Sequence, residues 1–188
     1  SQALARQIES GAPADVFISA GVGPVTLLED AGLVAQGSRR SLLLNRLVVV
    51  ARSGVPEPTF LLDLTRDDYR RIALANPALA PAGKYAREAL VGQGIWDAIH
   101  KKVVFGADVR VTLTYVETGN ADAALVYATD ARSSPGLSSL DIVPEGIYKP
   151  IVYPAIVVSG SEDISIAAEF IEYLRSQPSV ETFRRYGF

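Results

Sequence analysis

The sequence predicts an α/β fold with largely parallel sheets, divided between two lobes. Short apolar segments typical of buried strands alternate along the chain with segments of helical periodicity. Two apolar segments, at residues 47–51 (LVVVA) and 153–160 (YPAIVVSG), are longer than the rest. They bracket about one hundred residues, which is near the usual size of a small domain. We therefore expect the chain to leave one lobe, build a second and return, with a cleft between the lobes.

The predicted elements begin with a helix over residues 2–10, which Ser1 precedes as its N-cap and Gly11 ends. This helix leads into a buried strand at residues 15–19 (DVFIS). A helix that feeds a buried parallel strand normally follows an earlier strand. We therefore expect the first lobe, within these residues, to lack its N-terminal strand–helix–strand.

The middle and the end of the chain continue the alternation. The helix over residues 109–118 has the clearest period, because Val109, Leu113 and Val116 share one face. Residues 132–140 (RSSPGLSSL) are rich in Ser, Pro and Gly and predict a surface loop. The remaining strands are predicted over residues 46–51, 70–75, 102–105, 123–127, 141–143 and 151–159, and the remaining helices over residues 24–31, 82–92, 95–101, 161–176 and 178–186.

The composition excludes several classes of function. With 18 basic and 21 acidic residues the net charge is −3, which argues against a general nucleic-acid binder. The absence of cysteine excludes disulfides, thiolate catalysis and zinc–thiolate sites. No apolar run of about 18 residues predicts a transmembrane helix, and no segment has a signal-peptide pattern. A small anion still suits the chain as a ligand, because backbone N–H groups bind anions without net positive charge.

Residues suited to catalysis are scarce. His100 is the only histidine and lies near a predicted helix end, where the helix dipole favours an exposed imidazole. Asp63, Asp67 and Asp68 fall in a turn-like segment (DLTRDD) and are predicted to be solvent-facing turn residues rather than paired catalytic acids. We therefore predict that the protein is not an enzyme, has no cofactor and offers no side-chain ligands to a metal cation.

Four positions have the chemistry of a neutral anion site. Ala82 and Val109 lie in the first turns of two predicted helices, where backbone N–H groups have no intrahelical acceptor. Tyr127 ends a predicted strand at its carboxyl edge, where ligands of open α/β sheets bind. Ser1 precedes the first helix. Each position also has an ordinary interpretation: a strand–helix connection at Ala82, a helix capped by Asp108 at Val109, a core or rim tyrosine at Tyr127, and a helix N-cap at Ser1.

Longer segments carry a specific resemblance. They are the opening SQALARQIESGAPADVFISA, the strand NRLVVVA, the segments NPALAPAGKYAREAL and ADVRVTLTYVETGNADAALVYATDA, the strand VYPAIVV and the closing FRRYGF. Together they extend over essentially the whole chain. In these segments the sequence resembles the periplasmic molybdate-binding proteins of bacterial ABC transporters.

The resemblance implies a particular arrangement of the two lobes. The expected fold is the two-lobed type II periplasmic binding protein fold, in which αβα sandwich lobes flank a ligand cleft and close around a tetrahedral dianion. Residues 1–46 and 155–188 would form lobe I, and residues 47–154 would form lobe II. The crossings between the lobes would lie near residues 46–51 and 151–158.

The resemblance also implies a ligand set and a biological role. Ser1 would donate its hydroxyl, Ala82 and Val109 their backbone N–H groups, and Tyr127 its phenol to molybdate or tungstate. The implied protein is a periplasmic solute-binding receptor that works as a monomer and delivers the oxyanion to an ABC permease for uptake. Neither an enzymatic activity nor a nucleic-acid partner is expected.

Two alternatives to a working receptor stay open. The family begins with a strand ending in a loop whose serine is a further ligand, and that segment is not among these residues. We therefore expect the residues given, by themselves, to bind molybdate weakly or not at all. The second alternative is the ligand-sensing domain of a transcription regulator, because the same two-lobed fold serves there. The segments quoted above favour the receptor.

Overall fold

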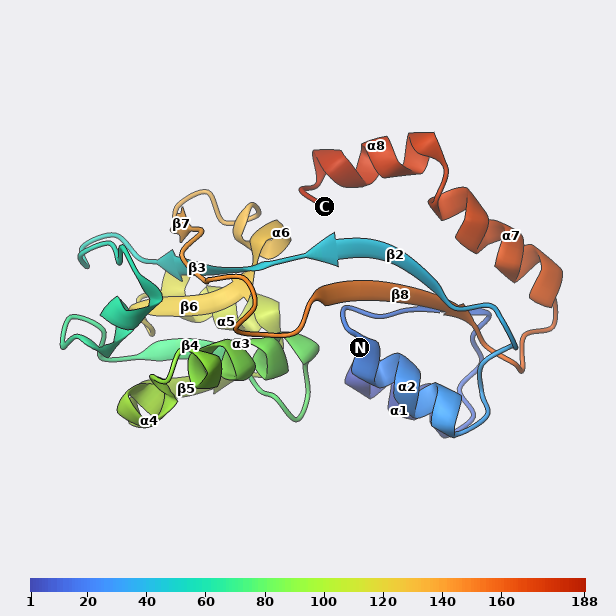
Figure 1. Ribbon diagram of the computed structural model, residues 1–188, viewed down its shortest axis with the longest axis horizontal. Helices are drawn as coiled ribbons and strands as arrows, with labels where there is room; N and C mark the ends of the chain where they lie inside the picture. Colours follow the sequence, from blue (N-terminus) through green and yellow to red (C-terminus); the bar gives the residue numbers. More distant parts are fainter. The chain divides into compact units, whose positions relative to one another are not determined.

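The computed structural model describes residues 1–188, and its internal contacts divide the chain into two units (Figure 1). The first unit comprises Ser1–Asn45 and Ile151–Phe188, and the second comprises Arg46–Pro150. Strand β8 (Ile151–Val157) lies in the first unit from its first residue, because it pairs there with strand β2 (Arg40–Asn45). The sequence prediction places this return to the first lobe a few residues later. The assignment of the units to lobes I and II stays a prediction.

The first unit contains a three-stranded sheet in the order β1–β8–β2, where β1 spans Val16–Ile18. β8 runs antiparallel to both neighbours, so the prediction of parallel pairing is wrong for this sheet. β2 leads into the second unit and β8 leads out of it, and these two adjacent strands run in opposite directions. The sequence did not predict β2, whose six residues (RSLLLN) are all exposed or half-buried and adjoin the stronger apolar run LVVVA.

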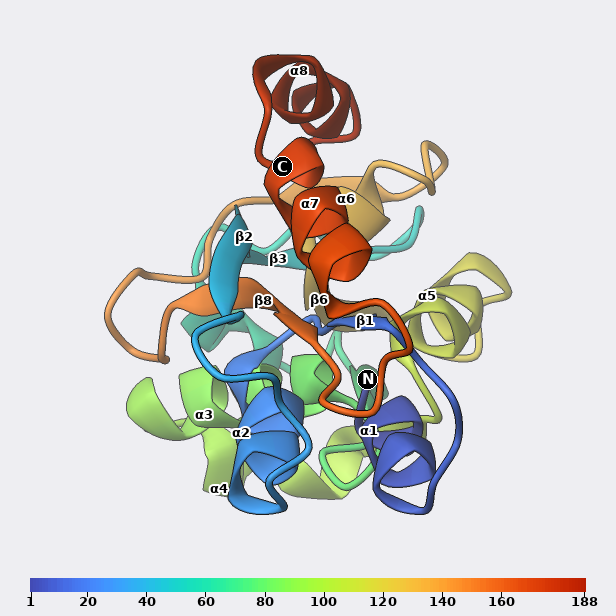
Figure 2. The same ribbon diagram turned by 90° about the vertical axis from the view of Figure 1, so that its right-hand side faces the viewer.

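Helices cover both faces of this sheet (Figure 2). On one face lie α1 (Gln2–Glu9) and α2 (Val22–Asp30), and on the other lies α7 (Ile164–Leu174), which α8 (Gln177–Arg185) follows. None of the helices in the structure has the length and apolar composition needed to cross a membrane. The buried residues of the first face are Ala5, Ile8, Phe17, Val25, Leu28, Ile156 and Val158, and those of the second are Ala155, Val157, Ala167 and Ile171.

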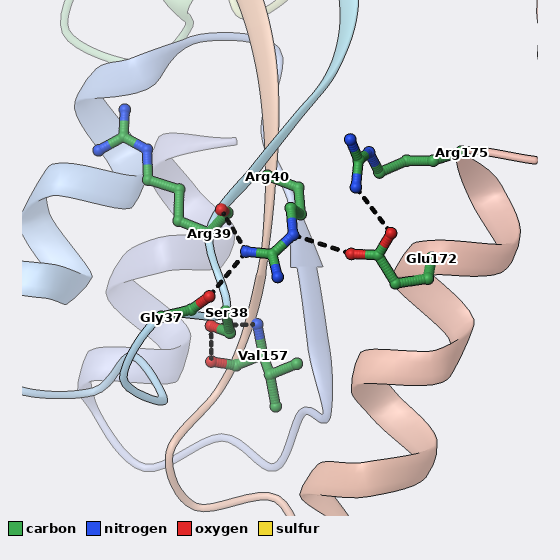
Figure 3. Close-up of polar contacts among 7 residues, drawn as sticks. All are labelled: Gly37, Ser38, Arg39, Arg40, Val157, Glu172 and Arg175. Atoms are coloured by element: carbon green, nitrogen blue, oxygen red, sulfur yellow. Dashed lines mark hydrogen bonds and ion pairs between the residues drawn. The ribbon is translucent and has the colours of Figure 1, made fainter.

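A polar cluster joins the start of β2 to β8 and α7 (Figure 3). Arg40 Nε donates to one carboxylate oxygen of Glu172 at 2.8 Å, and Arg175 Nη1 donates to the other at 2.6 Å. Ser38 Oγ accepts a hydrogen bond from the N–H of Val157 at 3.1 Å. The guanidinium of Arg40, followed by that of Arg175, holds the pKa of Glu172 below its usual range. The cluster thereby fastens α7 to an edge strand of the sheet.

The second unit contains a five-stranded sheet in the order β5–β4–β6–β3–β7. β4 (Ile72–Ala75) pairs in parallel with β5 (Val103–Gly106) and with β6 (Ala123–Tyr127). β3 (Leu47–Ala51) runs antiparallel to β6 and to the edge strand β7 (Ser138–Leu140). The structure thus confirms parallel pairing for β4, β5 and β6 and contradicts it for β3 and β7.

The connections of the second unit follow the predicted strand–helix alternation. α3 (Pro81–Gly92), α4 (Trp96–Ile99) and the 3₁₀ turn η2 (His100–Lys102) join β4 to β5, and α5 (Val109–Glu117) joins β5 to β6. The short helix α6 (Ala128–Ala131) and the 3₁₀ turn η1 (Leu61–Thr65) were not predicted, because they are too short for a helical period to show.

One stretch after β6 differs from the prediction. The strand expected over residues 141–143 does not form, and the expected loop over residues 132–140 ends in β7. β7 exists because it pairs with β3, which lies far from it in sequence. Its own three residues, SSL, carry no strand signal.

Asp122 fastens the strands at one end of this sheet. One carboxylate oxygen accepts hydrogen bonds from Nη2 and Nε of Arg52, at 2.9 and 3.1 Å. The other accepts from the backbone N–H groups of Arg70 and Arg71, at 2.8 and 2.9 Å. Burial would raise the pKa of Asp122, but these four donors outweigh burial and hold the pKa below its usual range. Because Asp122 immediately precedes β6, this clamp lies opposite the strands' carboxyl ends.

Candidate functional site

The carboxyl ends of β4, β5 and β6 lie at the same edge of the second unit's sheet, because β4 is parallel to both neighbours. Ala82, Val109 and Tyr127 stand at or just beyond these strand ends, where α3, α5 and α6 begin. We call this edge, with its three residues, the donor edge. The structure thus brings together three of the four predicted donors, whereas Ser1 belongs to the first unit. Their role as ligand groups stays a prediction.

The start of α3 has no side-chain cap. Its N-cap residue is Ala80, and Pro81 at the first helical position has no N–H to satisfy. The next N–H belongs to Ala82, which is 3% exposed. First-turn N–H groups lack an intrahelical acceptor, and the helix dipole places partial positive charge there. Ala82 therefore has the position that anion binding by a backbone donor requires.

Asn76 holds the loop that leads to α3. Its side-chain Oδ1 accepts from the N–H of Ala78 at 2.9 Å, and its carbonyl accepts from the N–H of Ala80 at 2.9 Å. Its own N–H donates to the carbonyl of Gly106 at 2.8 Å. Because Gly106 is the last residue of β5, this bond joins the loop after β4 to the neighbouring strand end.

The start of α5 is partly capped. The N-cap is Asp108, as the sequence predicted, and its carboxylate accepts from the N–H of Val111 at 2.9 Å. Its carbonyl accepts from the N–H of Thr112 at 3.1 Å and from the Thr112 hydroxyl at 2.7 Å. The N–H groups of Val109 and Arg110 precede the capped position and fall in the first turn, which lacks intrahelical acceptors. A helix cap at Asp108 and an anion-binding role for Val109 are therefore compatible, because the cap uses the N–H of Val111 and the anion would use the N–H groups of Val109 and Arg110.

Tyr127 is both the last residue of β6 and the N-cap of α6. It is 3% exposed, and its register partner in β3 is Leu47. The next residue, Ala128, donates its N–H to the carbonyl of Arg46 at 2.9 Å, which fixes the turn from β6 into α6. The predicted position of the tyrosine at a carboxyl edge is confirmed.

Asp130 is a carboxylate of this region that the sequence analysis missed. It lies in α6, one turn after Tyr127. Burial raises its pKa to about 6; the charge of Arg110 opposes the shift and that of Asp108 adds to it. The signal available in the sequence was the segment VYATDA, which places an acid three residues after Tyr127.

Ser1 is the N-cap residue of α1, as predicted, but its hydroxyl does not cap that helix. Instead Ser1 Oγ accepts from the backbone N–H of Ala20 at 3.0 Å. Ala20 follows β1 and precedes α2, so the bond joins the start of the first helix to the next strand–helix junction. A serine hydroxyl that accepts a hydrogen bond also has one hydrogen to donate.

The residues considered for catalysis do not form a catalytic group. The exposed His100 has its Nδ1 2.9 Å from the carbonyl of Asp97. Asp63 accepts from the N–H of Phe60 at 2.9 Å, and Asp68 pairs with Arg66 at 3.0 Å. The prediction of an exposed turn residue is confirmed for Asp68, whereas Asp63 is half-buried in η1. No group of three or more His, Cys, Asp or Glu side chains is arranged to hold a metal cation.

Comparisons with known proteins agree on one family. The model of the bacterial extracellular solute-binding proteins matches residues 1–188. The molybdate-binding protein ModA of Escherichia coli (strain K12) is 38% identical over 193 residues, which cover 100% of this chain and 75% of that protein. ModA of Haemophilus influenzae is 34% identical over 194 residues, with the same coverage. The solved periplasmic molybdate-binding protein of Azotobacter vinelandii superposes with a TM-score of 0.87 at 26% identity, covering 100% of this chain and 83% of that one.

These comparisons confirm the predicted fold class and class of function. The mixed α/β architecture with open sheets is that of type II periplasmic binding proteins. The matching family consists of solute-binding proteins, so the chain is a binding protein and not an enzyme. The resemblance carried by the sequence segments is confirmed as well. The chain belongs to the family of bacterial extracellular solute-binding proteins.

Proposed function

We propose that this protein is the receptor of a bacterial uptake system for molybdate, with tungstate as a second ligand. The observation that carries the proposal is the donor edge, where Ala82, Val109 and Tyr127 come from three adjacent strand–helix junctions. Relatives that match the whole chain are named as molybdate-binding proteins, which supports the choice of anion.

The proposed donors suit an anion that carries no proton. Backbone N–H groups can only donate hydrogen bonds, and helix starts add partial positive charge without a salt bridge. Phosphate keeps a proton near neutral pH and would need an acceptor in the site, whereas molybdate, tungstate and sulfate do not. Charge and protonation therefore select this group of dianions, and the spacing of the donors would separate the larger molybdate and tungstate from sulfate.

In the proposed mechanism the protein binds and releases its ligand without chemical change. Ala82 and Val109 donate from their backbone N–H groups, Tyr127 from its phenol and Ser1 from its hydroxyl. Preorganised donors in a site closed to water bind an anion more strongly than donors exposed to solvent. The receptor works as a monomer in the periplasm and delivers the oxyanion to an ABC permease.

Isothermal titration tests this proposal. The protein, expressed from its complete reading frame, is titrated in parallel with molybdate, tungstate, sulfate and phosphate. We expect submicromolar binding of molybdate and tungstate, much weaker binding of sulfate and none of phosphate. Binding of phosphate or sulfate in preference to molybdate would contradict the proposal, and so would the absence of binding to all four anions.

A further inference from the structure

Two glycines stand at the strand–helix junctions of the donor edge. Gly83 is the third residue of α3, and Gly106 is the last residue of β5. Neither has the positive φ that makes glycine necessary for its backbone conformation. What both share, together with Gly92, is that a Cβ added at the position would lie less than 3.0 Å from other atoms.

Gly83 lets the first turn of α3 lie directly on the end of β4. A Cβ at this position would lie 2.0 Å from the carbonyl oxygen of Ala75 and 2.8 Å from the nitrogen of Pro77. Both are backbone atoms, which cannot swing aside as the end of a side chain can. Any larger residue must therefore move the first turn of α3 and the end of β4 apart. Because Ala82 is the preceding residue, its N–H moves with that turn.

Gly106 likewise lets the first turn of α5 lie directly on the end of β5. A Cβ there would lie 2.7 Å from Thr112 Oγ1, 2.9 Å from Thr112 N and 3.2 Å from the carbonyl oxygen of Asp108. These atoms belong to the first turn of α5, which contains Val109. The carbonyl of Gly106 also accepts the hydrogen bond from Asn76 at 2.8 Å. Gly106 thus contacts the start of α5 and, through Asn76, the loop that leads to α3.

We propose that Gly83 and Gly106 are positioning residues that set the spacing between the N–H groups of Ala82 and Val109, and with it the size of tetrahedral anion that binds best. This inference rests on the proposed function. Hydrogen bonds keep a narrow range of length, so donors held at a fixed spacing favour one anion radius over another. The packed backbone contacts at the two glycines supply that fixed spacing.

The test compares three single variants of the protein expressed from its complete reading frame. Gly83→Ala and Gly106→Ala each disturb one helix start. Gly92→Ala is the matched control, because it lies at the other end of α3 and its Cβ would meet the carbonyl oxygen of Ile147 at 2.3 Å. Molybdate and sulfate affinities are measured by titration, and folding is measured by circular dichroism and thermal melting.

We expect the ratio of the sulfate Kd to the molybdate Kd to fall by about tenfold or more in Gly83→Ala and Gly106→Ala, a change of one order of magnitude in relative affinity. Gly92→Ala should lower the melting temperature and leave the ratio unchanged. If Gly83→Ala fails to fold, Gly106→Ala decides whether the glycines set selectivity. Part of its contact is with the side chain of Thr112, whereas the Cβ of Gly83→Ala meets only backbone atoms.

Several results would overturn this inference. A ratio that stays within about twofold of the parent in both variants, or that falls equally in Gly92→Ala, would show that the glycines do not set selectivity. If neither variant folds, the two glycines serve folding alone and not selectivity. In each of these cases the parent protein would still prefer molybdate, and the proposed function would stand. A parent protein that binds neither anion would overturn the proposed function together with this inference.

Discussion

Tyr127 is the side chain at the donor edge whose predicted role is the easiest to isolate. It ends β6, is 3% exposed and differs from phenylalanine by one hydroxyl. If its phenol donates to the oxyanion, Tyr127→Phe should weaken molybdate binding by about 1–3 kcal/mol, the usual loss for a hydrogen bond to a charged group. Titration of the variant measures this directly, and an unchanged affinity would remove Tyr127 from the site.

Tyr69 offers a matched control for this substitution. It is also fully buried in the second unit, and its hydroxyl donates to the carbonyl of Pro56. Tyr69→Phe should lower stability, because it leaves that carbonyl without its donor. It should leave the molybdate affinity as in the parent.

Asp130 should make stability depend on pH. Because burial raises its pKa from 3.8 to about 6, the folded state holds the proton more tightly than the unfolded state does. The folded state therefore loses stability as the pH rises from about 4 to about 6, and the loss remains above that range. Asp130→Asn should raise the free energy of unfolding by roughly 1–3 kcal/mol at neutral pH and by little at about pH 4. Urea titrations at the two pH values measure this, and an equal gain at both would contradict the assignment.

At the scale of elements, the sequence predicted the strands and helices whose own residues show an apolar run or a helical period. β6 was predicted with its observed bounds, because its five buried apolar residues follow one another without interruption. The α5 prediction succeeded because its apolar residues recur with the helical period. β2 and β7 were missed because their existence depends on pairing with β8 and β3, strands distant in sequence. The antiparallel direction of β8 likewise depends on the whole path of the chain.

The Asp122 clamp joins elements far from the donor edge, so a substitution at Asp122 should lower stability without changing molybdate affinity. Asp122→Ala removes the acceptor of two backbone N–H groups and of the Arg52 guanidinium. We expect a loss of about 2–4 kcal/mol in the free energy of unfolding, because these partly buried donors are left unsatisfied. The molybdate affinity of the folded variant should match that of the parent. Chemical unfolding and titration of the same preparation test both statements, and a large loss of affinity in a folded variant would contradict the second.

At the scale of the whole molecule, the sequence predicted the family and the fold class, because the resemblance extends over nearly the entire chain. The helix starts next to Ala82 and Val109 could be predicted from the sequence, because small residues and an N-cap mark them; the role of both residues as ligand groups stays a prediction. The place of Asp130 three residues after Tyr127 is visible in the sequence, but its burial is not, because its helix has only four residues and the burial depends on tertiary packing. The hydrogen bond from Ala20 to Ser1 also lay beyond sequence reasoning, since it joins two junctions that only the fold brings together.

A crystal structure of the protein with bound molybdate, its complete reading frame expressed, tests the central claim most directly. The anomalous scattering of molybdenum locates the anion without ambiguity. The account predicts that its oxygens lie within hydrogen-bond distance, about 2.7–3.2 Å, of the N–H groups of Ala82 and Val109 and the hydroxyls of Tyr127 and Ser1. Molybdate bound away from the donor edge, or held there by lysine and arginine side chains instead of these neutral donors, would contradict it.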